Sequence, residues 1–252
     1  MKAMILAAGL GTRLRPLTDS RPKALVEVCG RALLEITLLR LRSFGVTEVI
    51  INVHHFSDQV VAYLKAKQNF RMRIEISRED DLLLDTGGGL KKAAWFFLQD
   101  GSEQPFLLHN VDVLSDIDLA RMLQAHREAG ALATLAVQRR DSSRQLLFDE
   151  RAQLCGRGKS GEMNGEVVRP SKVLEPLAFS GIHVISPRLL RLISEDGAFS
   201  IIDTYLRLAA AGEKIQSFRA DQYSWLDLGK PQSIKQAEIG LQQGVWSVER
   251  EQ

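Results

Sequence analysis

The sequence predicts an α/β fold, in which a Rossmann-like three-layer α/β/α arrangement surrounds a mixed, mainly parallel sheet. Over residues 2–138, short apolar runs of strand length alternate with longer helical segments. This alternation is typical of parallel strands joined by helical crossovers. The first apolar run, Ala3–Ala8, leads directly into a loop of small residues, Ala7–Thr12. Because ligands bind outside the carboxyl ends of the strands in such sheets, we expect a ligand site at this loop.

The elements of the first half follow from the composition of each segment. Apolar, alternating or β-branched runs predict strands at Lys2–Ala8, Glu48–Val53, Arg73–Ser77, Gln104–Leu108 and Ala131–Gln138. The intervening segments predict helices at Leu33–Ser43, Asp58–Ala66, Gly89–Leu98 and Ile117–Ala129. The first of these helices carries leucine or isoleucine at most of its positions, so we expect it to be buried.

The second half is less regular. We expect a hairpin of two strands, Arg144–Phe148 and Gln153–Gly156, and then an exposed, polar and glycine-rich loop at Gly156–Glu166. A strand at Phe179–Ile185, helices at Pro187–Ile193 and Ile201–Ala211, a strand at Lys214–Phe218 and a last helix at about residues 232–241 complete the prediction. Neither a repeat nor a linker divides the sequence, which predicts one domain over residues 1–252.

Composition excludes several classes of protein. Hydrophobic residues make up 45% of the 252 residues and the formal net charge is only +2, which argues against a general nucleic-acid binder. No apolar run reaches the roughly 18 residues that span a bilayer, so no membrane partner is expected. Met4–Ala8 is too short for the apolar core of a signal peptide. Cys29 and Cys155 have no metal-ligand spacing, and a cytoplasmic location is expected.

The loop after the first strand is followed by a cluster of cations. Arg13, Arg15, Arg21 and Lys23 lie within a dozen residues of it. Backbone amides in a glycine loop together with mobile positive charges are suited to a polyphosphate. A dinucleotide fingerprint fits less well, because Leu14 stands at its third glycine position, and the Gly-Lys-Ser/Thr ending of a Walker loop is absent. A plain βα turn with surface arginines is the remaining alternative.

These residues resemble a known family. Leu6–Thr18 (LAAGLGTRLRPLT), followed by Arg-Pro-Lys at 21–23, is similar to the signature of the sugar-1-phosphate nucleotidyltransferases, also called nucleotide-sugar pyrophosphorylases. The similarity resumes at Asp85–Gly89, Asn110–Asp112, Phe179–Gly181 and Trp225–Pro231. The short chain and the triple glycine look most like the N-acetylmuramate 1-phosphate uridylyltransferases and the heptose and mannose 1-phosphate guanylyltransferases.

The resemblance implies a reaction and its partners. A sugar 1-phosphate attacks the α-phosphorus of a nucleoside triphosphate, with UTP or GTP favoured, and pyrophosphate leaves. Mg²⁺ is the implied cofactor. The nucleophile is already an anion at neutral pH, so no general base is required, and positioning and charge neutralisation remain for the protein to supply. The implied nucleotide-binding half covers residues 1–138 and the sugar-binding half residues 139–245.

The resemblance also implies site residues. Arg13 and Lys23 match catalytic cations, and Asp112 and Asp227 match the metal ligands. The implied nucleotide-binding residues are Leu6, Ala7, Ala8, Gly9, Gly11, Thr12, Arg13, Asp85, Thr86, Gly87, Gly88 and Asn110. The implied sugar-phosphate-binding residues are Lys23, Glu175 and Gly181. A glycine-rich helix start is an alternative for the triple glycine, and both interpretations can hold together.

Two positions depart from the family pattern. Val111 stands where the family usually has glycine, and it either packs in the core or narrows the ribose site. Leu174-Glu175-Pro176 replaces the Glu-Lys-Pro of the glucose 1-phosphate thymidylyltransferases, which points away from glucose. Alternatives to the main hypothesis are a cytidylyltransferase for a non-sugar phosphate and a catalytically impaired regulatory homologue. The histidines His54, His55 and His109 are interpreted as structural or solvated rather than as metal ligands.

Overall fold

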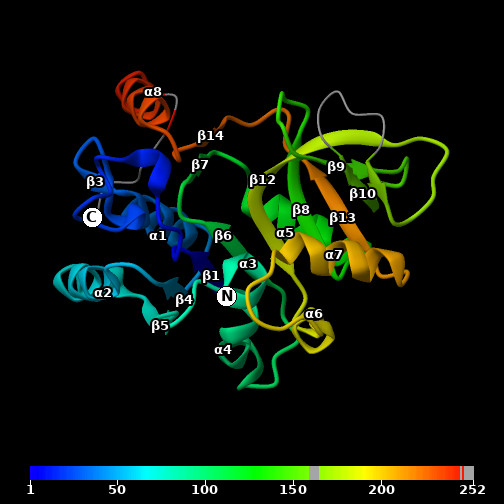
Figure 1. Ribbon diagram of the computed structural model, residues 1–252, viewed down its shortest axis with the longest axis horizontal. Coiled ribbons are helices and arrows are strands. Elements are labelled where there is room, and N and C mark those ends of the chain that lie inside the picture. Colours follow the sequence, from blue (N-terminus) through cyan, green and yellow to red (C-terminus); the bar gives the residue numbers. More distant parts are fainter. Residues whose placement is uncertain (159–164, 245, 247–252) are drawn as a thin grey trace.

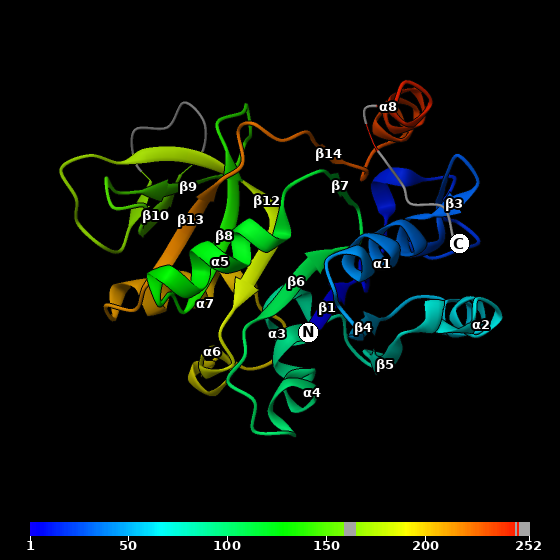
Figure 2. The ribbon, with the colours of Figure 1, turned by 180° about the vertical axis from the view of Figure 1, so that it is seen from behind.

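The computed structural model describes residues 1–158, 165–244 and 246. A sheet of ten strands forms the middle layer, with helices on both faces (Figures 1 and 2). Its strands are β1 (Lys2–Leu6), β4 (Glu48–Val53), β5 (Arg73–Arg78), β6 (Phe106–Asn110), β8 (Ala133–Gln138), β9 (Gln145–Phe148), β10 (Leu154–Gly158), β11 (Glu166–Val167), β12 (Glu175–Ile185) and β13 (Ile215–Arg219). The predicted three-layer α/β/α fold is therefore confirmed.

Two small strand pairs lie outside this sheet, and eight α-helices complete the described part of the chain. The pairs are β2 (Glu27–Val28) with β3 (Arg31–Ala32), and β7 (Val113–Ser115) with β14 (Trp225–Asp227). The helices are α1 (Leu33–Ser43), α2 (Ser57–Ala66), α3 (Asp85–Lys92), α4 (Ala94–Leu98), α5 (Leu119–Ala129), α6 (Arg188–Leu192), α7 (Ile201–Ala210) and α8 (Pro231–Gln242). None of the described helices is long and apolar enough to cross a membrane.

The first half of the chain forms a parallel sheet with β1 in its interior. Strands β6, β1, β4 and β5 are adjacent and parallel, in that order. Because side chains alternate across a strand, Ala3 and Ile5 of β1 join the core under α1, whereas Met4 joins the core on the opposite face, under α3 and α4. Both faces of β1 are thus buried, and its carboxyl end opens at the loop that carries the cations.

The second half is built around the long strand β12. Ile182–Ile185 pair antiparallel with β6 on one edge of β12, and β8 pairs antiparallel with Ala178, Phe179 and residues 183–185 on the other edge. Strand β9 pairs antiparallel with residues 175–177. Strand β12 therefore joins the two halves of the sheet, as Figure 1 shows near its centre. The predicted hairpin is confirmed as the antiparallel pair β9 and β10.

Several predicted boundaries were wrong. The helix expected from Gly89 begins at Asp85, and it ends at Lys92, with a second helix starting at Ala94. The loop expected at residues 156–166 overlaps β10 and β11, and its middle, residues 159–164, lies outside the described residues. The short strands β2, β3, β7 and β14 carried too few residues to give a local pattern, because their pairing partners are what define them.

The burial of three histidines predicts that the stability of the protein depends on pH. Burial lowers the pKa of His109 and of His126 to about 4, and that of His183 to about 3. The neutral rings are built into hydrogen bonds: His126 lies between Thr134 Oγ1 at 2.9 Å and Ser186 Oγ at 3.0 Å. An unfolded histidine titrates at about 6.5, so below this pH the unfolded chain binds more protons than the folded one.

We therefore expect the histidines' contribution to the free energy of unfolding to be complete above about pH 6.5 and to decrease as the pH drops toward about 4. Between about pH 7 and pH 5.5 the loss should be about 1 kcal/mol for each histidine. Urea titrations at the two pH values measure it. Between the two pH values, the His126→Gln variant should lose about a third less free energy of unfolding than the wild type. Equal stability of the wild type at the two pH values would contradict the prediction.

Candidate active site

The loop after β1 is shaped by one glycine. Gly11 has a φ of +65°, and a Cβ atom there would lie 2.9 Å from Thr18 Cγ2 and 3.0 Å from Lys23 Cβ. Glycine satisfies both the left-handed backbone and the close approach. The hydroxyl of Thr18 donates a hydrogen bond to the Gly11 carbonyl at 2.9 Å. This contact folds the loop back, so that Arg13 and Lys23 both lie near the carboxyl ends of the central strands.

Lys23 and Asp112 form an ion pair beyond the end of β6. The Lys23 Nζ contacts Asp112 Oδ2, and their side chains are only 12% and 17% exposed. The attraction between two largely buried opposite charges offsets part of the desolvation cost of each. The backbone carbonyl of Asp112 accepts a hydrogen bond from Leu228 N at 2.8 Å, which ties this point to the strand β14.

Strand β14 brings Asp227 to the same place. In the antiparallel pair of β7 and β14, Asp227 lies opposite Val113, the residue after Asp112. Asp227 Oδ2 lies 3.9 Å from Arg13 Nη2, and Asp227 Oδ1 accepts the Gly229 N–H at 2.7 Å. The four residues expected to carry the chemistry therefore come together as two oppositely charged pairs, although Asp227 is far from the others in sequence.

These carboxylates fit the magnesium ion that the resemblance implies. Mg²⁺ is usually bound by one or two carboxylates together with phosphate oxygens and water, and Asp112 and Asp227 supply two carboxylates. Among the described residues no group of three or more His, Cys, Asp or Glu side chains could hold a metal ion. His54 contacts the Glu79 carbonyl and His109 the Asn110 carbonyl, in agreement with the structural interpretation of these two histidines.

A first cavity, of about 480 Å³, lies between the loop after β1 and the start of α3. We call it the nucleotide cavity. Its lining comprises Leu6, Ala8, Gly9, Lys23, Asn52, Leu83, Asp85, Thr86, Asn110, Val111, Asp112 and Ala198. Asp85 has a φ of +58°, and its carboxylate accepts the Thr86 N–H at 2.6 Å. Six of the twelve expected nucleotide-binding residues therefore line this cavity, whereas Ala7, Gly11, Thr12 and Arg13 do not.

The glycines Gly87 and Gly88 are placed differently. Neither lines the cavity; a Cβ atom on Gly87 would meet the ring of Phe199, and one on Gly88 would meet the Gly197 carbonyl. The amide of Gly87 donates to the Phe199 carbonyl at 2.9 Å. These two glycines let the start of α3 pack against residues 197–199, so the structure favours the helix-start interpretation for them.

A second cavity, of about 670 Å³, lies between β12, β14 and the hairpin of β9 and β10. We call it the distal cavity. Gly181, with a φ of +74°, lines it, and a Cβ atom there would lie 2.8 Å from Asn110 Nδ2. The two cavities share Asn110 and Asp112 in their linings. Two molecules, one bound in each cavity, would therefore meet at the ion pair of Lys23 and Asp112.

The distal cavity contains a cation that the sequence analysis missed. Arg140 stacks on the ring of Trp225 at 3.7 Å and donates a hydrogen bond to the Phe179 carbonyl at 2.6 Å. Burial lowers the pKa of its guanidinium, and the nearby Asp227 opposes this effect. Its position two residues after the apolar strand β8 was the one available signal. Arg157, another lining residue, is already paired with Glu166 and Asp203 at 2.8 and 2.5 Å.

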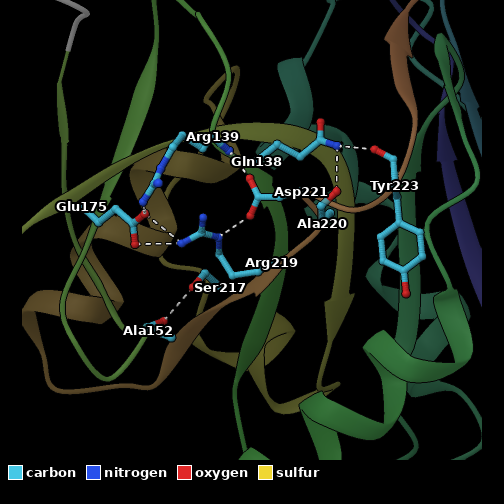
Figure 3. Close-up of polar contacts among 9 residues, drawn as sticks. All are labelled: Gln138, Arg139, Ala152, Glu175, Ser217, Arg219, Ala220, Asp221 and Tyr223. Carbon is cyan, nitrogen blue, oxygen red and sulfur yellow. Dashed lines mark hydrogen bonds and ion pairs between the residues drawn. The ribbon is translucent and has the colours of Figure 1, made fainter.

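The structure does not bring Glu175 to either cavity. Its carboxylate accepts hydrogen bonds from Arg139 at 2.6 Å and from Arg219 at 2.8 Å, and lines neither cavity. Figure 3 shows these three side chains together. The hydrogen bond from Arg139 lowers the pKa of this carboxyl, and Arg219 adds to the effect. Arg219 also pairs with Asp221. Glu175 therefore belongs to an ion-pair cluster beside β8 and β13, and a short motif could not reveal partners so distant in sequence.

Val111 lies in the core. It is 4% exposed and packs in the cluster formed by β1 and α1, which supports the core interpretation. It also contributes to the lining of the nucleotide cavity, as the ribose interpretation requires, so the two interpretations are separated by experiment. Replacing Val111 with glycine should reduce the free energy of unfolding by about 1–3 kcal/mol, through lost packing and added backbone freedom. Thermal melts and nucleotide preference measured on the same variant check this. An unchanged melting temperature with a changed preferred base would contradict it.

Comparison with known proteins agrees with this geometry. A model of the family described as "Nucleotidyl transferase" matches residues 2–244. The chain belongs to this family. It is 34% identical over 249 residues to an N-acetylmuramate alpha-1-phosphate uridylyltransferase of Caulobacter vibrioides, covering 95% of this chain and 96% of that relative. It is 30% identical to a mannose-1-phosphate guanyltransferase of Aspergillus fumigatus, covering 93% of this chain but only 62% of the relative.

Solved structures share the fold of this family member. HddC from Yersinia pseudotuberculosis matches with a TM-score of 0.76 at 20% identity, over 95% of this chain and 99% of that one. A UDP-glucose pyrophosphorylase complexed with UDP-glucose matches with a TM-score of 0.76 at 16% identity, over 96% and 98% of the two chains. At these identities the likeness concerns the fold.

Proposed function

We propose that this protein transfers a nucleotidyl group from a nucleoside triphosphate to a sugar 1-phosphate and releases pyrophosphate. The observation that carries the proposal is the pair of cavities that share Asn110 and Asp112. The family match and relatives named as uridylyl- and guanylyltransferases support it. UTP and GTP are the favoured donors.

The proposed reaction is a direct displacement. An oxygen of the sugar phosphate attacks the α-phosphorus, a new P–O bond forms, and the bond from the α-phosphorus to the bridging oxygen breaks. The departing pyrophosphate keeps the electron pair of that bond. The attacking oxygen is already ionised, so proton removal by a side chain is not needed. Lys23 lies at the junction of the cavities and Arg13 beside Asp227, where both can neutralise the charge on the phosphates.

The two aspartates complete the charge arrangement. Asp112 and Asp227 would hold Mg²⁺, which supplies Lewis-acid stabilisation of phosphate charge when it is bound. Lys23, the present partner of Asp112, would then be available to the phosphates. The backbone amides of Gly9, Gly11 and Thr12 would donate to the triphosphate, and Asp85 and Thr86 would contact the base at the other wall of the nucleotide cavity.

The distal cavity would take the sugar. Gly181 and Arg140 line it next to Asp112, and Arg140 supplies positive charge for a sugar phosphate. We propose a nucleotide-binding half, residues 1–138, and a sugar-binding half, residues 139–245. The cavities support this division because most lining residues of each come from one half, apart from Ala198 in the nucleotide cavity and Asn110, Asp112 and Val113 in the distal cavity. Relatives named as N-acetylmuramate and mannose 1-phosphate transferases support a sugar phosphate acceptor over the alternative acceptors considered above.

The test is a grid of substrates. The five common nucleoside triphosphates are each combined with N-acetylmuramate, mannose and glucose 1-phosphates, and with a non-sugar phosphate such as glycerol 3-phosphate, in the presence of Mg²⁺, and pyrophosphate release is measured. Release with UTP or GTP and one of the sugar phosphates is expected. Release only with CTP and a non-sugar phosphate would favour the cytidylyltransferase alternative. Absence of release in every combination would favour a non-catalytic homologue.

A further inference from the structure

We propose that Asn52 and Glu79 act as a positioning pair that fixes the distance between the two walls of the nucleotide cavity. This inference rests on the proposed function. Asn52 belongs to β4 and is 2% exposed, and Glu79 follows β5 and is 1% exposed. Neither residue is part of the motifs discussed above, and only Asn52 lines the cavity.

Three hydrogen bonds link the walls through these two side chains. The Ala7 N–H, in the loop after β1, donates to Asn52 Oδ1 at 2.8 Å. Asn52 Nδ2 donates to Glu79 Oε1 at 2.7 Å. The Leu84 N–H, directly before α3, donates to Glu79 Oε2 at 2.9 Å. A continuous path therefore runs from the phosphate-binding loop to the segment that begins with Asp85.

The burial of Glu79 indicates that this path is more than packing. A buried carboxylate is unfavourable unless its oxygens are hydrogen-bonded, and here each oxygen accepts one of the bonds on the path. The third glycine of the triple glycine makes room for the pair: a Cβ atom on Gly89 would lie 2.8 Å from both Asn52 Nδ2 and Glu79 Oε1. Gly89 is thus explained by the pair rather than by a base.

The pair should govern nucleotide binding and not sugar binding. Ala7 is adjacent to the cavity residues Leu6 and Ala8, and Leu84 is adjacent to Asp85. A nucleotide held between these two walls requires their spacing to be set before it binds, since preorganised groups lose less freedom on binding. The distal cavity does not include either member of the pair.

Exchanging the amide and the carboxylate gives a sharp test. Asn52→Asp alone places two acceptors against each other, and Glu79→Gln alone leaves one donor facing another donor. In the double variant, the new carboxylate at position 52 accepts from the Ala7 N–H and from the new amide at position 79, whose oxygen accepts from the Leu84 N–H. All three bonds and the net charge are retained. Thr134→Val is the matched control, because it removes a buried hydrogen bond to His126 that lies outside both cavities.

Affinity for UTP and GTP is measured by calorimetry, and KM for the sugar phosphate by pyrophosphate release. Each single variant should bind nucleotide about tenfold or more weakly, because a buried polar group is left unpaired, with the sugar KM within about twofold. The double variant should recover to within about threefold of the wild type. Thr134→Val should lower the melting temperature but leave the nucleotide affinity and the sugar KM unchanged. Single variants that melt lower but keep their nucleotide affinity would overturn the proposal, as would a double variant that regains stability without affinity.

Amide hydrogen exchange separates this proposal from the proposed function. In the Glu79→Gln variant, the Ala7 amide hydrogen should exchange about tenfold faster or more than in the wild type. Ala7 is hydrogen-bonded to Asn52 and not to Glu79, so this effect must pass through Asn52. This readout needs neither nucleotide nor catalysis. If the wild type bound no nucleotide, the proposed function would fail while faster exchange at Ala7 would still support the coupling. Unchanged exchange at Ala7 would overturn the positioning pair in either case.

Discussion

Replacing Lys23 with alanine is expected to reduce turnover about 10²-fold or more while leaving the fold intact, since removing one preorganised charge-stabilising group typically has an effect of this size. Lys23 contacts Asp112, a residue that lines both cavities, and in the proposed reaction charge develops at this point. The change also leaves Asp112, only 17% exposed, without its cation. Arg13→Ala should show a loss of similar size, since Arg13 faces Asp227.

The control is another arginine from the same loop. Arg15 is 69% exposed, pairs with Asp19 at 3.5 Å and lines neither cavity. Arg15→Ala should keep turnover within about threefold of the wild type, because exposed ion pairs contribute little. Steady-state kcat values for the three variants, with melting curves to check folding, decide the point. A near-normal kcat in Lys23→Ala would remove that residue from the proposed mechanism.

Removing divalent metal is expected to abolish activity, and adding Mg²⁺ or Mn²⁺ should restore it. Both ions accept oxygen ligands, and Asp112 and Asp227 are the carboxylates that the pairing of β7 and β14 brings together. Asp112→Asn and Asp227→Asn should each raise the metal concentration needed for half-maximal activity about tenfold or more, since an amide oxygen is a weaker ligand than a carboxylate oxygen.

Asp118→Asn is the matched control for these two variants. Asp118 caps the start of α5, where its side chain accepts the Arg121 N–H at 2.9 Å, and asparagine can keep this bond. Its metal requirement should equal that of the wild type. Metal titrations of activity for all three variants give the comparison, and an aspartate whose replacement leaves the titration unchanged is not a metal ligand.

The central strands could be predicted because their information is local. Strand β1 and the buried helix α1 have runs of apolar residues whose spacing alone indicates the element. The glycine loop, the cations after it and an acid following an apolar strand also lie within short segments. Their placement at one end of the sheet follows from the rule that parallel strands end at the same edge.

Other features depended on contacts between distant segments. Asp227 reaches Asp112 because β14 pairs with β7, two short strands that are defined only by each other. Glu175 matches a family position only weakly, and Arg139 and Arg219 hold it away from both cavities. Arg140 is a candidate because its guanidinium stacks on the ring of Trp225, a contact that the sequence does not reveal. In each case the deciding partner lies more than thirty residues away.

The sequence by itself therefore determined the fold class, the glycine loop proposed to bind phosphate and, through the family resemblance, the four charged residues proposed for the reaction. Only the tertiary structure decided which glycines face a cavity and which pack against protein, where Glu175 lies, and that Asn52 and Glu79 connect two walls of one site. The physical reason is that strand and helix signals arise from neighbouring residues along the chain. The hydrogen bonds and ion pairs that position a site join side chains that only the folded chain brings together.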